Sequence, residues 1–146
     1  MKLSSDSDCP CRARESAPLN YGRCCQPWHL GLASAVHAPT AQALMRSRYS
    51  AYALAKTNDE FGRSMLRYLL GTWHMSTCPG EGELELGPTQ WTGLEVLHDE
   101  ESGDAAVVEF KAHFKVNGKA ELMHETSRFV RLNGAWKYID GNFEGR

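Results

Sequence analysis

The sequence lacks several features that would assign it to a large class of proteins. No apolar run is long enough to span a bilayer, and the polar residues 1–8 do not have the apolar core of a signal peptide. The formal net charge is only −2, so no excess of either sign argues for nucleic acid or an anionic membrane as a partner. We therefore expect a soluble, cytoplasmic protein that binds neither nucleic acid nor membrane.

Signatures of catalysis are also missing. The chain shows no nucleophile–base motif, no phosphate-binding glycine loop and no catalytic metal triad. Its 146 residues are enough for one domain of ordinary size with a short appendage. The residues by themselves therefore predict a single main domain and identify no reaction.

Cysteine is scarce outside the N-terminal region. Four of the five cysteines fall within the first 25 residues, as Cys-Pro-Cys, a loop of twelve residues and Cys-Cys; they are Cys9, Cys11, Cys24 and Cys25. Two short pairs joined by a loop can supply the four tetrahedral ligands of zinc, and a reducing cytoplasm favours metal over disulfides. The spacing within each pair is tighter than usual, so four free thiols remain the alternative. Cys78 has no cysteine near it in sequence and is expected to be a bystander.

Two Asn-Gly dipeptides, Asn117–Gly118 and Asn133–Gly134, predict a three-stranded antiparallel meander that begins near residue 105. Because side chains alternate between faces, the two turns place one set on a single inner face. That set is Phe110, Ala112, Phe114, Met123, Glu125, Ser127, Phe129, Trp136, Tyr138 and Asp140. The other face, with Lys111, His124 and Arg128, is expected to face water. A further strand is predicted over 91–97, followed by an acidic turn at 98–104.

Two helices are predicted before the sheet. Thr40 is a candidate N-cap for a helix over 41–55, and Asn58 or Asp59 for a helix that runs to about residue 70. Residues 26–38 are interpreted as a linker. Helices followed by an antiparallel sheet are the pattern of an α+β layer fold.

Arg48 lies in the middle of the apolar stripe of the first predicted helix, whereas Arg46 points away from it. An arginine among apolar residues is costly unless it is paired. Arg48 therefore either reaches solvent at the edge of the stripe or pairs with one of the two inward carboxylates, Glu125 or Asp140.

Five segments resemble the YchJ family of small bacterial proteins: MRSRYSAY (45–52), TWH (72–74), WTGL (91–94), HETSRF (124–129) and WKYIDG (136–141). The resemblance implies a nuclear-transport-factor-2-like α+β cone over 31–146, with helices packed on a curved antiparallel sheet around a cavity. It also implies a small zinc-knuckle-like segment over 1–30, since the cysteines resemble the SEC-C motif. Zinc would then be the cofactor, held by Cys9, Cys11, Cys24 and Cys25.

The chain departs from that pattern in two ways. The Gly-Ser-Gly that usually follows Cys-Pro-Cys is replaced, and residues 1–146 carry no second copy of the motif at their C-terminal end. The core of the main domain is expected to draw nothing from the knuckle, so that it would survive loss of the metal.

The resemblance implies a fold and no activity, so three functions remain open. The first is a binding or adaptor protein whose knuckle docks a partner protein and whose cavity takes a small molecule or peptide, with Arg48, Trp73, His74, Glu125, Ser127 and Asp140 as cavity residues. The second is an isomerase- or dehydratase-like enzyme that uses Glu125, Asp140 or His74 as general base, although a histidine after a tryptophan is more often a packing residue. The third is a structural cone whose inward polar groups only satisfy Arg48.

One observation would separate these functions. An unpaired carboxylate with a shifted pKa in a deep, open cavity would favour the enzyme. A filled cavity with Arg48 closed onto a carboxylate would favour the other two.

Overall fold

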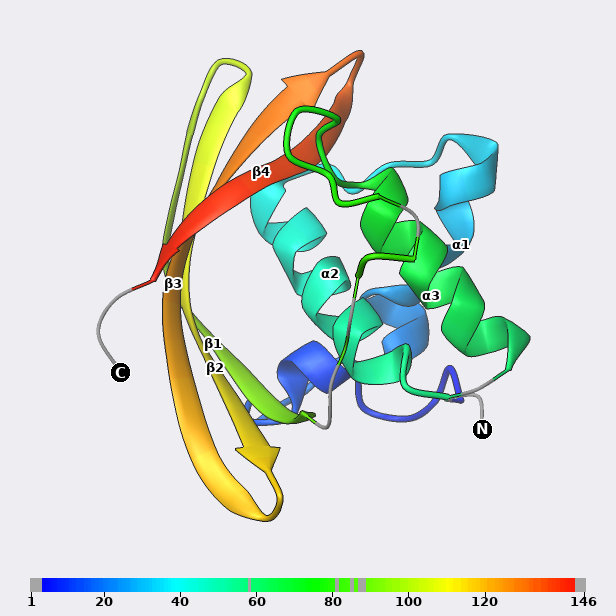
Figure 1. Cartoon of the computed structure of the whole chain (residues 1–146), viewed down its shortest axis with the longest axis vertical. Helices are drawn as coiled ribbons and strands as arrows, with labels where there is room; N and C mark the ends of the chain where they lie inside the picture. The colour runs from blue at the N-terminus through cyan, green and yellow to red at the C-terminus, as the bar shows by residue number, and fades with distance from the viewer. Residues whose placement is uncertain (1–3, 58, 81, 85, 87–88, 144–146) are drawn as a thin grey trace.

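The computed structural model describes residues 4–57, 59–80, 82–84, 86 and 89–143. Within them, helices cover the concave face of a curved four-stranded sheet (Figure 1). The elements are α1 (Gln26–Gly31), α2 (Ala41–Leu54), α3 (Glu60–Gly71), β1 (Gln90–Ser102), β2 (Ala105–Val116), β3 (Lys119–Leu132) and β4 (Ala135–Phe143), with short 3-10 helices η1 (Pro10–Arg12), η2 (Tyr21–Arg23) and η3 (Leu32–Ser34). The predicted α+β fold is confirmed. None of the described helices is long and apolar enough to cross a membrane.

The two long helices begin where their capping residues predict. The hydroxyl of Thr40 accepts a hydrogen bond from the Ala43 amide at 3.0 Å, and the carboxylate of Asp59 accepts one from the Gly62 amide at 2.9 Å. Each bond satisfies an amide that has no partner within the helix. The predicted linker is wrong in part, because Pro27 lies in the first turn of α1, where a missing N–H costs nothing.

The sheet is the predicted antiparallel meander, with strand order β1-β2-β3-β4. Asn117 and Asn133 have positive φ values of 54° and 52°, and each is followed by a glycine with positive φ, as the tight turns require. The predicted pairing of Phe110 with Glu125 is observed. The acidic turn is wrong, because β1 continues to Ser102 in register with the start of β2.

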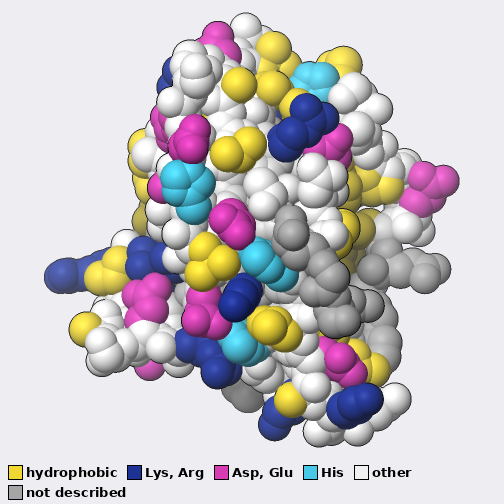
Figure 2. Space-filling view, turned by 90° about the vertical axis from the view of Figure 1, so that its left-hand side faces the viewer, with side chains coloured by type: hydrophobic (Ala, Val, Ile, Leu, Met, Phe, Trp, Pro, Cys, Tyr) yellow, Lys and Arg dark blue, Asp and Glu magenta, His cyan; other side chains and the backbone are white. Residues whose placement is uncertain are grey.

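The outer face of the sheet is charged (Figure 2). Arg128 is exposed there, and the Nε2 atoms of His113 and His124 form hydrogen bonds with the carboxylates of Glu95 and Glu109 at 2.6 and 2.7 Å. The inner face carries buried Phe110 and Phe129. The register of β2 against β3 is therefore as predicted.

The pairing of β3 with β4 slips by one residue. Phe129 pairs with Tyr138, but Arg128 pairs with Asp140, so Ile139 is an extra residue in β4. A bulge of one residue reverses the face of every later side chain in the strand. The prediction that Asp140 faces inward is wrong: its carboxylate lies on the outer face, in an ion pair with Arg128 whose N–O contacts are 2.6 and 2.8 Å.

The helix α2 is surrounded by other elements, which include η1, α1, α3 and three of the strands. For that reason both of its arginines are buried, and the expectation that Arg46 faces water is wrong. The Arg46 guanidinium donates to the Cys11 carbonyl at 3.2 Å and contacts Glu15 at 3.2 Å.

The cysteine-rich segment and the main domain share one hydrophobic core. Cys9, Cys11, Tyr21 and Cys25 belong to the same buried cluster as Leu44 of α2 and the inner face of the sheet. The expectation that the main core draws nothing from the knuckle is therefore wrong. The predicted boundary between residues 30 and 31 falls inside α1.

Candidate metal centre and cavity

The four N-terminal cysteines converge on one point. Cys9 and Cys11 come from η1 and its N-cap, and Cys24 and Cys25 lie between η2 and α1. Their sulfur atoms all lie within 4.8 Å of one another, and the shorter separations run from 3.5 to 3.8 Å. A tetrahedral site with Zn–S bonds of about 2.3 Å has edges of about 3.8 Å. The four thiols therefore fit a tetrahedral metal ion.

Polar groups from the knuckle itself and from α2 surround the cluster. Arg12 Nε donates to Cys24 Sγ at 3.4 Å, Arg46 Nη1 lies 3.9 Å from Cys11 Sγ, and Ser50 Oγ donates to Cys25 Sγ at 3.3 Å. Four thiolates around one divalent cation leave two negative charges, and the two arginines carry two positive ones. Donors that bond to the sulfur atoms in this way stabilise the thiolates as metal ligands.

Hydrogen bonds among the four thiols shift their pKa values in opposite directions. Hydrogen bonds from Cys11 and Cys25, with Arg12 adding to them, lower the pKa of Cys24 well below its ordinary value. Hydrogen bonds within the cluster raise the pKa of Cys11 and of Cys25, so the thiolate form that a metal ion requires is favoured at Cys24.

A buried histidine joins the knuckle to α2. His29 Nδ1 accepts a hydrogen bond from the Tyr21 hydroxyl at 2.6 Å, and Nε2 donates to the Ser47 carbonyl at 2.8 Å. This pair of partners fixes the neutral tautomer with the proton on Nε2. Burial lowers the pKa of His29 to about 4. The sequence did not predict the contacts of His29, nor those of Arg46 and Ser50 with the cysteines, because the partners are distant in sequence.

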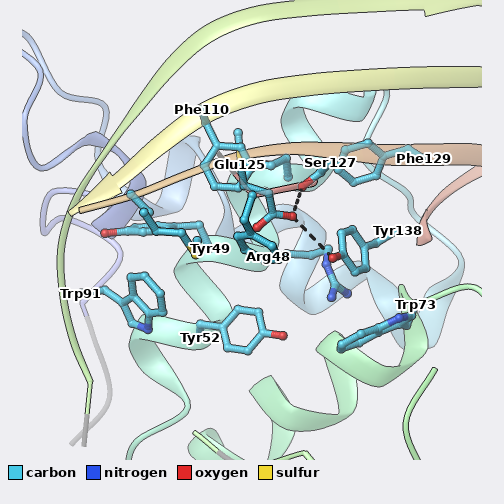
Figure 3. Close-up of a pocket in the computed structure, with 14 residues that line it drawn as sticks. Arg48, Tyr49, Tyr52, Trp73, Trp91, Phe110, Glu125, Ser127, Phe129 and Tyr138 are labelled. Carbon is cyan, nitrogen blue, oxygen red and sulfur yellow. Dashed lines mark hydrogen bonds between the residues drawn. The ribbon is translucent and has the colours of Figure 1, made fainter. Parts of the chain in front are cut away.

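A cavity of about 330 Å³ lies between α2 and the concave face of the sheet (Figure 3). Most of its wall is aromatic. The lining residues are Met45, Arg48, Tyr49, Tyr52, Trp73, Trp91, Phe110, Ala112, Met123, Glu125, Ser127, Phe129, Tyr138 and Phe143.

Four of the six predicted cavity residues line this space: Arg48, Trp73, Glu125 and Ser127. Tyr49 and Tyr52 were not proposed as site residues, although they lie on the same helical stripe as Arg48, which is the signal that could have found them. Nothing in the sequence indicated Phe143, because it faces the cavity only as a result of the bulge at Ile139.

Arg48 is buried, with 5% of its surface exposed, and its partners differ from the predicted ones. Nη1 donates to the Leu69 carbonyl and to the Thr72 hydroxyl, each at 2.7 Å. The guanidinium carbon lies 4.8 Å from the ring centre of Trp73 and 4.7 Å from that of Tyr138, between the two rings (Figure 3). The predicted ion pair with Glu125 or Asp140 is wrong, because the end of α3 and two aromatic faces hold the cation instead.

Glu125 is the carboxylate of the cavity. It is 6% exposed, and its Oε2 accepts hydrogen bonds from Ser127 Oγ at 2.5 Å and from Tyr138 Oη at 3.4 Å. Burial raises the pKa of Glu125, while these hydrogen bonds and the charge of Arg48 oppose the rise. Gly141, opposite Ser127, leaves the room that this carboxylate occupies, since a Cβ there would overlap Glu125 Oε2.

Two predicted site residues lie outside the cavity wall. Asp140 faces the opposite side of the sheet, as described above. His74 follows α3, and its Nδ1 accepts a hydrogen bond from the Ser76 amide at 3.1 Å while its own amide donates to the Tyr138 carbonyl at 2.7 Å. Those contacts close a local turn and tie it to β4, so His74 stabilises the structure at this point.

Helices on the concave face of an antiparallel sheet, an internal cavity and an N-terminal cluster of four cysteines define an NTF2-like α+β domain with a SEC-C-type segment. Residues 40–141 match the family described as "YchJ, middle NTF2-like domain". The chain belongs to this YchJ family.

Relatives support the assignment over nearly the whole chain. A UPF0225 protein of Ralstonia nicotianae is 47% identical over 146 residues, covering 92% of this chain and 90% of its own. A UPF0225 protein of Bordetella pertussis is 41% identical over 140 residues, covering 95% of each chain.

Two solved structures share the fold. The crystal structure of a SEC-C motif containing protein from Psychrobacter arcticus has a TM-score of 0.75 and 32% identity, over 99% of this chain and 87% of that one. The solution structure of a SEC-C motif containing protein from Rhodopseudomonas palustris has a TM-score of 0.69 and 28% identity, over 89% and 96%.

Proposed function

We propose that the protein is a zinc-containing binding protein, whose knuckle docks a partner protein and whose cavity takes a small molecule or the end of a peptide. The observation that carries the binding function is the cavity of about 330 Å³, which lies within the range of about 300–1,000 Å³ usual for ligand sites. Its wall is mainly aromatic, with a few polar groups that could orient a ligand.

Zinc is the proposed metal because a closed set of four thiolates suits a structural zinc site. Such a site leaves no coordination position for substrate, so the ion would hold the knuckle together and take no part in a reaction. The ligands would be Cys9, Cys11, Cys24 and Cys25.

Metal analysis of the purified protein tests the zinc site. We expect about one zinc per chain in the wild type, and none in a variant with Cys24→Ser and Cys25→Ser. Cys78→Ser is the matched control, since Cys78 lies outside the cluster and its Sγ donates to the Leu70 and Pro79 carbonyls. Equal zinc in the double variant and the control would remove the site from the proposal.

A fragment library of mixed charge, followed by ligand-observed NMR, tests the cavity. Met123→Trp would fill part of it, because Met123 lines the wall. Leu122→Trp is the control on the same strand, since Leu122 is exposed and lies outside the cavity wall. We expect some fragments to bind the wild type and Leu122→Trp but not Met123→Trp. If no fragment shows this dependence on Met123, the binding function is wrong.

A second candidate function rests on Glu125. Its carboxylate is buried, its pKa is raised by that burial, and the cavity in front of it is accessible. These are the conditions that favour a general base in an isomerase- or dehydratase-like enzyme. The test is exchange of α-protons of enolisable ketones in D₂O, followed by NMR. Exchange no faster than in Glu125→Gln would exclude this alternative.

A further inference from the structure

The fixed charge in the cavity wall is the Arg48 guanidinium. Nη1 donates to the Leu69 carbonyl of α3 and to the hydroxyl of Thr72, which follows that helix. The Tyr52 hydroxyl in the cavity wall also interacts with the guanidinium. An arginine carries further N–H donors and stays protonated in proteins. Among the described residues, no carboxylate forms an ion pair with it, and Glu125 acts on it only through its charge at longer range. An anion that enters the cavity would therefore meet a buried cation without a contacting counter-ion, the situation in which an ion pair gains most.

Two aromatic faces of the wall are already in contact with the Arg48 cation. Trp73 and Tyr138, the two rings that would attract an ammonium ligand, both face the Arg48 guanidinium at under 5 Å. A ligand cation at the same faces would be repelled by Arg48. Glu125, the one acid in the wall, holds its Oε2 against Ser127 and Tyr138. The charge pattern of the wall therefore disfavours a cation beside Arg48.

The rest of the wall favours a flat, apolar ligand. Tyr49 and Trp91 meet edge to face with ring centres 5.7 Å apart, and Phe110 is a further aromatic residue of the wall (Figure 3). Aromatic walls favour aromatic ligands, which can stack or meet them edge to face. The cavity volume lies near the lower end of the range of about 300–1,000 Å³ for ligand sites, which suits one ring or two fused rings.

We infer that the cavity ligand is a planar aromatic molecule with one negative charge, such as an aryl carboxylate, whose anionic group meets Arg48 and whose ring lies against Tyr49 and Trp91. This inference rests on the proposed binding function of the cavity and adds the chemical class of the ligand. The anionic group of the ligand would serve as the contacting counter-ion that Arg48 does not have among the described residues.

Isothermal titration calorimetry with three probes of similar shape tests whether the ligand is a planar aromatic anion. The probes are 1-naphthylacetate, 1-naphthylacetamide and 2-(1-naphthyl)ethylamine, which are respectively anionic, neutral and cationic. We expect the acetate to bind wild type about tenfold more tightly than the acetamide, and the amine to bind most weakly. Arg48→Met should remove the preference for the acetate and leave acetamide binding within about threefold.

Arg128→Met is the control, because Arg128 lies on the outer face in an ion pair with Asp140. It should keep the preference. Circular dichroism establishes that each variant is folded. If Arg48→Met does not fold, Arg48→Lys keeps the charge without the planar fork, and it should still bind the acetate more tightly than the acetamide.

Other outcomes overturn the inference in distinguishable ways. Equal binding of acetate and acetamide, or tighter binding of the amine, would exclude an anionic ligand while leaving a binding cavity. Absence of binding by all three, together with Met123-dependent binding of other fragments, would exclude this aromatic class alone. Absence of any Met123-dependent fragment would remove the binding function itself.

Discussion

The buried His29 makes stability depend on pH in a specific window. In the folded protein its pKa is lowered by burial from 6.5 to about 4, and its two ring nitrogens are bonded to Tyr21 and Ser47. Protonation would place a charge in the core and a second donor against the Tyr21 hydroxyl. The unfolded chain therefore takes up this proton before the folded protein does.

The sign and size follow from this difference. The folded pKa is depressed, so the contribution of neutral His29 is fully present above pH 6.5 and is lost as the pH falls towards 4. Within that window, the free energy of unfolding should fall by up to about 1.4 kcal/mol per pH unit. A lowering of the pKa from 6.5 to about 4 corresponds to about 3 kcal/mol in total.

Urea denaturation at several pH values between 7 and 4 measures this loss in wild type and in His29→Gln. Glutamine does not titrate, and its amide can still donate to the Ser47 carbonyl. Acid also protonates the cysteines, but both proteins carry them, so that effect cancels in the difference. We expect wild type to lose about 3 kcal/mol more than the variant across the window. Parallel curves would show that His29 is not a buried neutral group.

Three further predictions concern the cavity wall and the sheet beneath it, and can be tested by chemical denaturation at pH 7. Phe129→Ala should lower the free energy of unfolding by about 3–5 kcal/mol, because Phe129 is 1% exposed; a loss near that of an exposed residue would contradict the register. Arg48→Ala should cost about 2–3 kcal/mol through its two hydrogen bonds, against less than about 1 kcal/mol for Arg128→Ala on the outer face; similar losses would place Arg48 at the surface. Gly141→Ala should cost about 1–3 kcal/mol, because the new Cβ would displace the Glu125 carboxylate; a neutral effect would mean that this carboxylate lies elsewhere.

The architecture could be predicted because its signals are local. The Asn-Gly turns define the meander through backbone conformation, and Thr40 and Asp59 mark the helix starts by capping. The convergence of the four cysteines follows from their spacing and from the limited size of the loop between the pairs. Each of these conclusions depends on residues within a few turns of one another.

The partners of the arginines could not be predicted, for a physical reason. A helical wheel assumes that one side of a helix faces water, but α2 has neighbours on most of its sides. Arg46 therefore meets the Cys11 carbonyl where solvent was expected. Arg48 donates to a carbonyl and a hydroxyl at the end of α3. Such neutral acceptors leave no pattern in the sequence, whereas a carboxylate partner can be proposed from it.

The single extra residue in β4 decides which side chains of that strand face the interior. If Ile139 were paired in the ladder instead of forming a bulge, strict alternation would turn Asp140 inward beside Glu125 and Gly141 outward. The interior would then hold two acids with one arginine, and Phe143 would leave the wall. The bulge, and not the residue composition of β4, therefore keeps a second acid out of the interior.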